Sequence, residues 1–182
     1  MASAAKGFSI RNILLSMVFL LLAIFLPSIC ARIPGLDLVL LVMHIPIYLC
    51  GFICGAPLGF AIGMVAPVLR SVIFGVPALF PEGVAMMFEL AFYGLLAGAF
   101  FDTFRRSMGN RSVGASYLAL IIAMIGGRIA WGVAMLFMAI FTSVTFSWGE
   151  FIYGAFTGEI AAIVLHIVIV PGLVAQMEPS RR

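Results

Sequence analysis

The sequence predicts an all-α membrane protein, a single domain in which six transmembrane helices form a bundle. Hydrophobic residues make up 64% of the 182 residues and charged residues only 9%, and the mean hydropathy is +1.25. A soluble domain carries about a quarter charged residues, so this composition requires lipid as the solvent. The apolar runs are about twenty residues long and do not alternate with polar residues, which predicts helices rather than barrel strands.

The apolar runs and the breaks between them define the expected spans. The first run follows Lys6 and Arg11, and we expect it to be retained as a helix because it is long and no small-x-small cleavage site follows it. Gly55 to Pro57 predict a tight turn between the second and third spans. The expected spans cover residues 13–29, 38–54, 58–74, 84–101, 115–141 and 151–174.

Basic residues are distributed unequally between the two sides that this topology defines. The side that would hold Arg32 and Arg70 has these two basic residues at most. The positive-inside rule therefore places both termini in the cytoplasm, and we expect a multi-pass protein in the plasma membrane of a bacterium. The side with both termini and the even-numbered loops carries Lys6, Arg11, Arg105, Arg106, Arg111, Arg181 and Arg182.

Ionisable residues also lie inside the expected spans. Such residues cost a few kcal/mol each and usually face an interior or a cavity. Counted at about 1.5 Å per helical residue, four of the five fall in the outer half, in a layer roughly 10 Å thick, whereas Arg128 lies near the middle of the fifth span. This layer predicts a polar pocket open to the outside. Its members are His44, Arg70, Glu89 and Glu159.

Each of these residues also has a purely structural interpretation. Arg70 could extend to the outer headgroups. Glu89 and Arg128 could form an internal ion pair that fixes helix packing, and His44 could hydrogen-bond a carbonyl freed by Pro46. We place His166 deeper than His44 and expect it to be structural.

Aromatic residues would complete the pocket. The outer loop FGVPALFPEG is short, apolar and rich in proline, which predicts either a lid or a contact with lipid headgroups. As a lid, it would place Phe80 over the mouth of the pocket, while Tyr93 and Trp131 would stack on a ring-shaped solute. The expected substrate-binding residues are His44, Arg70, Phe80, Glu89, Tyr93, Arg128, Trp131 and Glu159.

Small residues recur on the second and third spans. Gly51, Gly55, Gly59 and Gly63 stand four apart, and small-xxx-small faces let helices approach closely. Packing within the monomer and docking to a partner both remain open. The three cysteines lack a CxxC pair and are expected to pack as small residues, so we predict no metal and no cofactor.

Enzymatic functions find little support in the sequence. The chain contains no GxxxxGK[ST] motif, so we do not expect it to hydrolyse ATP. Intramembrane proteases need paired aspartates, a Ser–His pair or HExxH, whereas Asp37 and Asp102 lie at span ends and no HExxH is present. His44 and His166 are expected at different depths. We therefore predict that the chain is not an enzyme.

Several segments together resemble the substrate-binding S component of an energy-coupling factor (ECF) transporter. They extend over nearly the whole chain after residue 38. The segments are HIPIYLCGFICGAPLGFAIGMVAPVLRSVIFGVPALFP, MMFELAFYGLLAG, IGGRIAWG and the closing IVLHIVIVPGLV. Six spans in fewer than 200 residues are also typical of this family.

The resemblance implies a vitamin or related small molecule bound from outside, and docking on a membrane coupling protein with two cytoplasmic ATPase subunits. Family members often carry AxxxA on the first span, where this chain has only Ser16 and Ala23 as small residues in mid-span. Two arginines and two glutamates at pocket depth favour a zwitterionic or carboxylate-bearing solute. The expected docking residues are Ser16, Gly51, Gly55, Gly59 and Gly63.

The alternative function is a membrane scaffold similar to the rod-shape factors of bacterial walls. Such a scaffold needs neither an outer polar layer nor a ligand.

Overall fold

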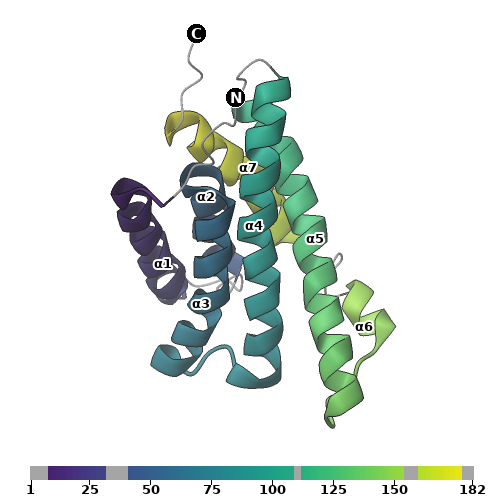
Figure 1. Ribbon diagram of the computed structural model, residues 1–182. Coiled ribbons are helices and arrows are strands. Elements are labelled where there is room, and N and C mark those ends of the chain that lie inside the picture. Colours follow the sequence, from purple (N-terminus) through teal and green to yellow (C-terminus); the bar gives the residue numbers. More distant parts are fainter. Residues whose placement is uncertain (1–7, 32–40, 109–111, 154–159, 178–182) are drawn as a thin grey trace.

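The computed structural model describes residues 8–31, 41–108, 112–153 and 160–177. These residues form helices and no strand, which confirms the predicted all-α class. Figure 1 shows a bundle with α4 at its centre. Four helical segments of the described chain are long and apolar enough to cross a membrane: Ile10–Cys30, Ala56–Phe74, Leu79–Ser107 and Val113–Phe141.

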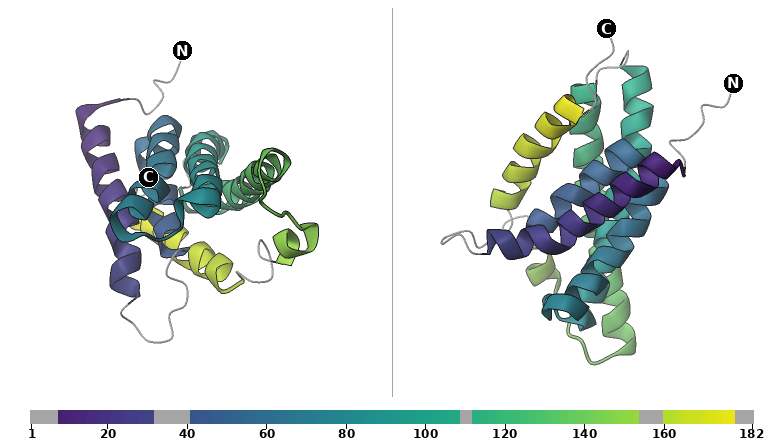
Figure 2. Two further views of the ribbon diagram at one scale, coloured as in Figure 1. Left: turned by 90° about the horizontal axis from the view of Figure 1, so that it is seen from below. Right: turned by 90° about the vertical axis from the view of Figure 1, so that its left-hand side faces the viewer.

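Helix α1 (Ile10–Cys30) begins at Ser9, whose side chain accepts a hydrogen bond of 3.2 Å from the backbone nitrogen of Asn12. A side-chain oxygen at this position satisfies one of the free N–H groups of the first turn. One face of α1, including Phe19 and Ala23, is buried, and the opposite face is exposed and apolar. Figure 2 shows that α1 crosses the bundle obliquely.

Helix α2 (His44–Cys54) follows the 3-10 turn η1 (Leu41–Met43), and all eleven of its residues are buried. It ends at Gly55, where φ is 100°, and α3 (Ala56–Phe74) begins at once. A side chain is strained at such a φ, so glycine allows the chain to reverse here. The predicted tight turn is confirmed, while residues 38–40 of the expected second span lie outside the described residues.

Helix α3 ends at Gly75, which has a left-handed φ of 71° and whose N–H donates to the Ser71 carbonyl at 2.9 Å. A π-helical turn, η2 (Leu79–Gly83), leads into α4 (Val84–Ser107). Helix α5 (Ser112–Phe141) then runs alongside α4 (Figure 1). Both helices extend beyond the spans expected from hydrophobicity.

Two described helices fall in or next to the last expected span, 151–174, and residues 154–159 of this span lie outside the described residues. Residues Trp148–Ile152 form a short helix, α6, whose Phe151 ring stacks on Trp131 of α5. Helix α7 (Ile160–Met177) is a separate element. The aromatic contact packs residues 148–152 against α5, and residues 154–159 between the two helices lie outside the described residues.

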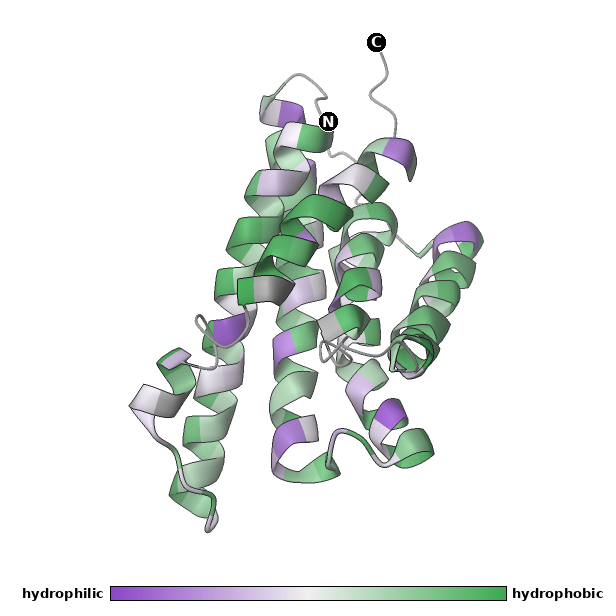
Figure 3. Ribbon diagram, turned by 180° about the vertical axis from the view of Figure 1, so that it is seen from behind, coloured by the Kyte–Doolittle hydropathy of each residue, from purple (hydrophilic) through white to green (hydrophobic). Residues whose placement is uncertain are grey.

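The ends of the helices fall at two ends of the bundle. The end of α4, the start of α5 and the end of α7 lie at the top in Figure 1, and α1 also starts toward the top. The α3–α4 connection and the end of α5 lie at the bottom. Figure 3 shows that the ribbon between these ends is mostly hydrophobic and carries isolated hydrophilic residues.

Candidate functional site

Glycines bring α2 and α3 against α4. A Cβ on Gly59 would lie 2.7 Å from the Gly94 carbonyl oxygen, and a Cβ on Gly98 would lie 2.7 Å from the Gly51 oxygen. A Cβ on Gly63 would collide with the Leu90 carbonyl. Atoms cannot approach this closely, so only glycine permits these backbone contacts.

These contacts bear on the docking residues expected from the sequence. Gly51, Gly59 and Gly63 face α4 of the same chain, and Gly55 ends α2. Ser16 is 2% exposed, and its hydroxyl donates to the Ile13 carbonyl at 2.7 Å. A partner could reach the glycine face only by displacing α4, so in this structure the face serves packing within the monomer.

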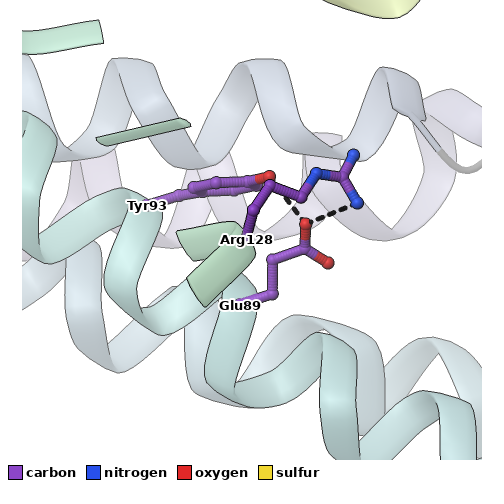
Figure 4. A network of polar contacts seen from close by, with 3 residues as sticks. All are labelled: Glu89, Tyr93 and Arg128. Carbon is purple, nitrogen blue, oxygen red and sulfur yellow. Dashed lines mark hydrogen bonds and ion pairs between the residues drawn. The ribbon is translucent and has the colours of Figure 1, made fainter. Parts of the chain in front are cut away.

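A charged network links α4 to α5. Glu89 and Tyr93 lie one turn apart on α4, and the Tyr93 hydroxyl donates to Glu89 Oε1 at 2.6 Å. Arg128 of α5 places Nη1 3.0 Å from the same oxygen (Figure 4). A Cβ on Gly127 would collide with the Tyr93 ring, so this glycine admits the ring against α5. The internal ion pair considered from the sequence is therefore formed.

Rings from α2 and α7 pack on this network. The Tyr93 ring centroid lies 5.3 Å from that of His44 and 4.8 Å from that of Tyr48. The His166 ring of α7 lies 5.6 Å from each of the two α2 rings. Four helices thus contribute to one buried group, which we call the polar cluster: His44, Tyr48, Glu89, Tyr93, Arg128 and His166.

His44 and Tyr48 differ from the rest of the polar cluster in their hydrogen bonding. Both nitrogens of the His44 ring and the Tyr48 hydroxyl are buried and have no hydrogen-bond partner among the described residues. The expected bond from His44 to a carbonyl freed by Pro46 is thus absent from the described part of the chain. An unsatisfied buried polar group costs about 1–3 kcal/mol, so these three atoms call for a partner such as water or a ligand.

Arg70 is directed at α1. Its Nη1 donates to the Ile24 carbonyl at 2.6 Å and to the Ser28 hydroxyl at 3.2 Å, and its guanidinium carbon lies 5.2 Å from the centre of the Phe74 ring. The residue is 3% exposed. These contacts fasten α3 to the second half of α1 through Nη1, while Nε of the same guanidinium is buried and has no hydrogen-bond partner among the described residues.

Trp131 and Phe80, also expected to bind substrate, lie apart from the contacts of the polar cluster. Trp131 stacks on Phe151, with centroids 5.8 Å apart and planes at 9°. Phe80 is 52% exposed and lines an apolar groove of about 680 Å³ on the surface of α4 and α5. Glu159 lies outside the described residues. The groove is lined by Phe80, Val84, Phe88, Phe92, Gly126, Ile129, Ala130, Val133, Ala134, Phe137 and Met138.

Sequence reasoning left Tyr48 and His166 out of the site. Tyr48 follows His44 by four residues, which puts both on one helix face, and this spacing was the available signal. His166 was placed at a different depth from His44, and the 5.6 Å between their rings corrects that placement. The depth count assumed upright helices, whereas α7 is inclined (Figure 2).

The described residues form no arrangement that could bind a metal ion. No group of three or more His, Cys, Asp or Glu side chains is placed there to hold a metal ion. Cys50 and Cys54 are buried thiols that form no disulfide within the described chain.

Comparisons with known proteins do not assign the chain to a family. No family model matches it, and neither curated proteins nor solved structures give a match.

Proposed function

We propose that this chain is the substrate-binding subunit of an ECF-type importer. It would capture a vitamin or related small molecule from outside, and a membrane coupling protein with two cytoplasmic ATPases would drive uptake. The observation that carries the proposal is the polar cluster. Six polar or ionisable side chains from four helices converge inside an apolar bundle, where each is costly unless it serves a function.

The members of the polar cluster would have different roles in binding. His44 and Tyr48 would supply hydrogen bonds to the solute, since their polar atoms lack a partner in the described chain. Tyr93 and His166 would supply ring surfaces. Glu89 and Arg128 would hold α4 and α5 in register through their 3.0 Å contact. Phe80, Trp131 and Glu159 stay predictions as ligand contacts.

Docking on the coupling protein would use the outward face of α1. The family resemblance points to this helix, and the glycine face is already covered by α4. The outward face is apolar, as a contact within the membrane requires. Its most exposed members are Ile10, Leu14, Met17, Leu21 and Ile29.

Binding and co-purification test the proposal. The purified chain should be stabilised by one member of a vitamin panel, by about 4 kcal/mol when the ligand is present at a thousand times its Kd. Expressed with an ECF coupling protein and its two ATPases, the chain should co-purify with them and support ATP-dependent uptake. The absence of both stabilisation and co-purification would contradict the proposal.

A membrane scaffold resembling a rod-shape factor is the second candidate. The observation that favours it is the Glu89–Arg128 pair, which balances these charges without any ligand. A scaffold predicts altered cell shape on depletion, unchanged vitamin uptake and no co-purification with an ATPase module.

A further inference from the structure

Two side chains on one face of α2 are the starting point. His44 and Tyr48 lie one helical turn apart, are completely or almost completely buried, and contact the rings of Tyr93 and His166. The three polar atoms that they contribute have no hydrogen-bond partner among the described residues. A neutral imidazole has one donor and one acceptor, and a phenol hydroxyl can do both. This face of α2 therefore offers neutral hydrogen bonds of both kinds.

The charged side chains of α3, α4 and α5 that were expected in the pocket make contacts with protein groups. Arg128 lies 3.0 Å from Glu89 Oε1, so these two opposite charges balance each other. Arg70 donates through Nη1 to the Ile24 carbonyl and the Ser28 hydroxyl of α1, and only its Nε has no partner among the described residues. A solute with a net charge would have to break one of these arrangements or be buried without a counter-charge. Either event is unfavourable in a medium of low dielectric constant.

We propose, building on the proposed function, that the ligand of the polar cluster is an uncharged polar solute that hydrogen-bonds to His44 and Tyr48. A hydroxyl or an amide provides the donor and acceptor that these side chains lack. The rings of the cluster contact one another at 4.8–5.6 Å, so the solute must displace at least one ring contact when it binds. The proposal replaces the carboxylate-bearing or zwitterionic solute expected from the sequence.

Matched pairs of acids and their uncharged counterparts test this proposal. Binding to the purified full chain in detergent is measured at neutral pH by calorimetry for pantothenate and pantothenol, biotin and biotinamide, and nicotinate and nicotinamide. Within a pair that binds, we expect the uncharged member to bind at least ten-fold more tightly. Equal or tighter binding of the acid would overturn the inference while leaving the importer function intact. The absence of binding by all six compounds, together with failure to co-purify with the coupling module, would overturn both.

A conservative variant tests the role of the α2 face. Tyr48→Phe removes only the hydroxyl, and we expect the affinity for the uncharged ligand to fall at least ten-fold. The melting temperature without ligand should not fall, because the hydroxyl makes no hydrogen bond within the described chain. The matched control is Tyr117→Phe, at a residue that is 40% exposed, and it should leave both quantities unchanged. Unchanged affinity in Tyr48→Phe would overturn the assignment.

His44→Phe provides a second test of the α2 face that does not depend on Tyr48. It replaces the imidazole by an apolar ring and removes both unpartnered nitrogens. We expect the same pattern, a loss of at least ten-fold in affinity with no loss of thermal stability. Unchanged affinity in His44→Phe would overturn the inference.

Discussion

At the scale of single residues, the Glu89 carboxylate is the centre of the described polar contacts. One of its oxygens receives the Tyr93 hydroxyl at 2.6 Å and Arg128 Nη1 at 3.0 Å, and the residue is 2% exposed. A buried ion pair adds little net stability over apolar packing, but the loss of one partner leaves a buried charge uncompensated. The cost of a substitution therefore depends on whether the other partner is still present.

A double-mutant cycle tests this dependence. Glu89→Leu and Arg128→Met are each expected to lower the free energy of unfolding by about 3–5 kcal/mol, because each removes one partner of the ion pair. The double variant should lose much less than the sum of the two. Unfolding in mixed detergent micelles measures all four proteins. Additive losses would show that the 3.0 Å contact does not couple the residues.

Arg70 yields a prediction that separates a structural role from a ligand-binding role. Its contacts with Ile24 and Ser28 imply that Arg70→Ala lowers the free energy of unfolding by about 1.5–3 kcal/mol, the range for hydrogen bonds of charged groups. Ligand affinity, measured by calorimetry, should stay within about two-fold, because these contacts are made with α1 and not with the ligand. The loss of a ligand contact worth about 1.4 kcal/mol would lower the affinity ten-fold. Ser28→Ala is the control and should cost less, because it removes only the 3.2 Å bond. A ten-fold loss of affinity with unchanged stability would instead place Arg70 in the pocket.

At the scale of elements, the contact of α2 and α3 with α4 depends on the absence of side chains. The carbonyls of Leu90 and Gly94 lie where a Cβ on Gly63 or Gly59 would stand. Backbone cannot yield to such a methyl group as a flexible side chain can, so the helices would have to separate. Close packing of this kind is how helices gain dispersion energy where lipid provides no hydrophobic driving force.

Alanine substitutions at two helical glycines should therefore differ in their effect on the free energy of unfolding. Gly63→Ala is expected to destabilise the protein by about 1–3 kcal/mol, the usual cost of overpacking. Gly172→Ala in α7, where no atom lies within 4 Å of the added Cβ, should be neutral or stabilise by up to about 1 kcal/mol through helix propensity. The melting temperatures of the two variants test this difference in stability. A stable Gly63→Ala protein would mean that α3 and α4 are not in contact at this point.

Hydrophobicity predicted the elements better than the site. Long apolar runs located α1, α3, α4 and α5, because a helix in lipid must be continuous and apolar. The runs did not show that α4 continues through Arg105 and Arg106, since a helix can extend beyond the lipid. They also could not separate α6 from α7, because the stacking of Phe151 on Trp131 joins residues twenty apart in sequence.

The site depends on the directions of side chains and helix axes, which cannot be obtained from a sequence. Glu89, Tyr93, His44 and Arg128 were expected in one pocket, and the structure brings them together. Arg70 was expected in the same pocket because it is an ionisable residue inside a span, yet its side chain is directed at α1. Counting residues along a span gives depth for an upright helix, but it gives neither the helix inclination nor the face on which a side chain lies.

At the scale of the whole molecule, the two ends of the bundle differ in charge. The end of α4 that carries Arg105 and Arg106 lies at the same end of the bundle as the last turn of α7 (Figure 1). The connection between α3 and α4 and the end of α5 lie at the opposite end. In a membrane, the more basic end is expected to face the cytoplasm. This orientation would direct the α3–α4 connection and its Phe80 outward, toward an external solute.

Cysteine labelling in intact cells tests the orientation. In a background with Cys30→Ser, we introduce Ser107→Cys at the end of α4 and Ser143→Cys just after α5, both at exposed positions. Cys50 and Cys54 are buried and should stay unlabelled. A membrane-impermeant maleimide should label the Ser143→Cys protein in intact cells and the Ser107→Cys protein only after permeabilisation. The reverse pattern would turn the α3–α4 connection toward the cytoplasm and contradict capture from outside, while labelling of both in intact cells would mean that α5 does not cross the membrane.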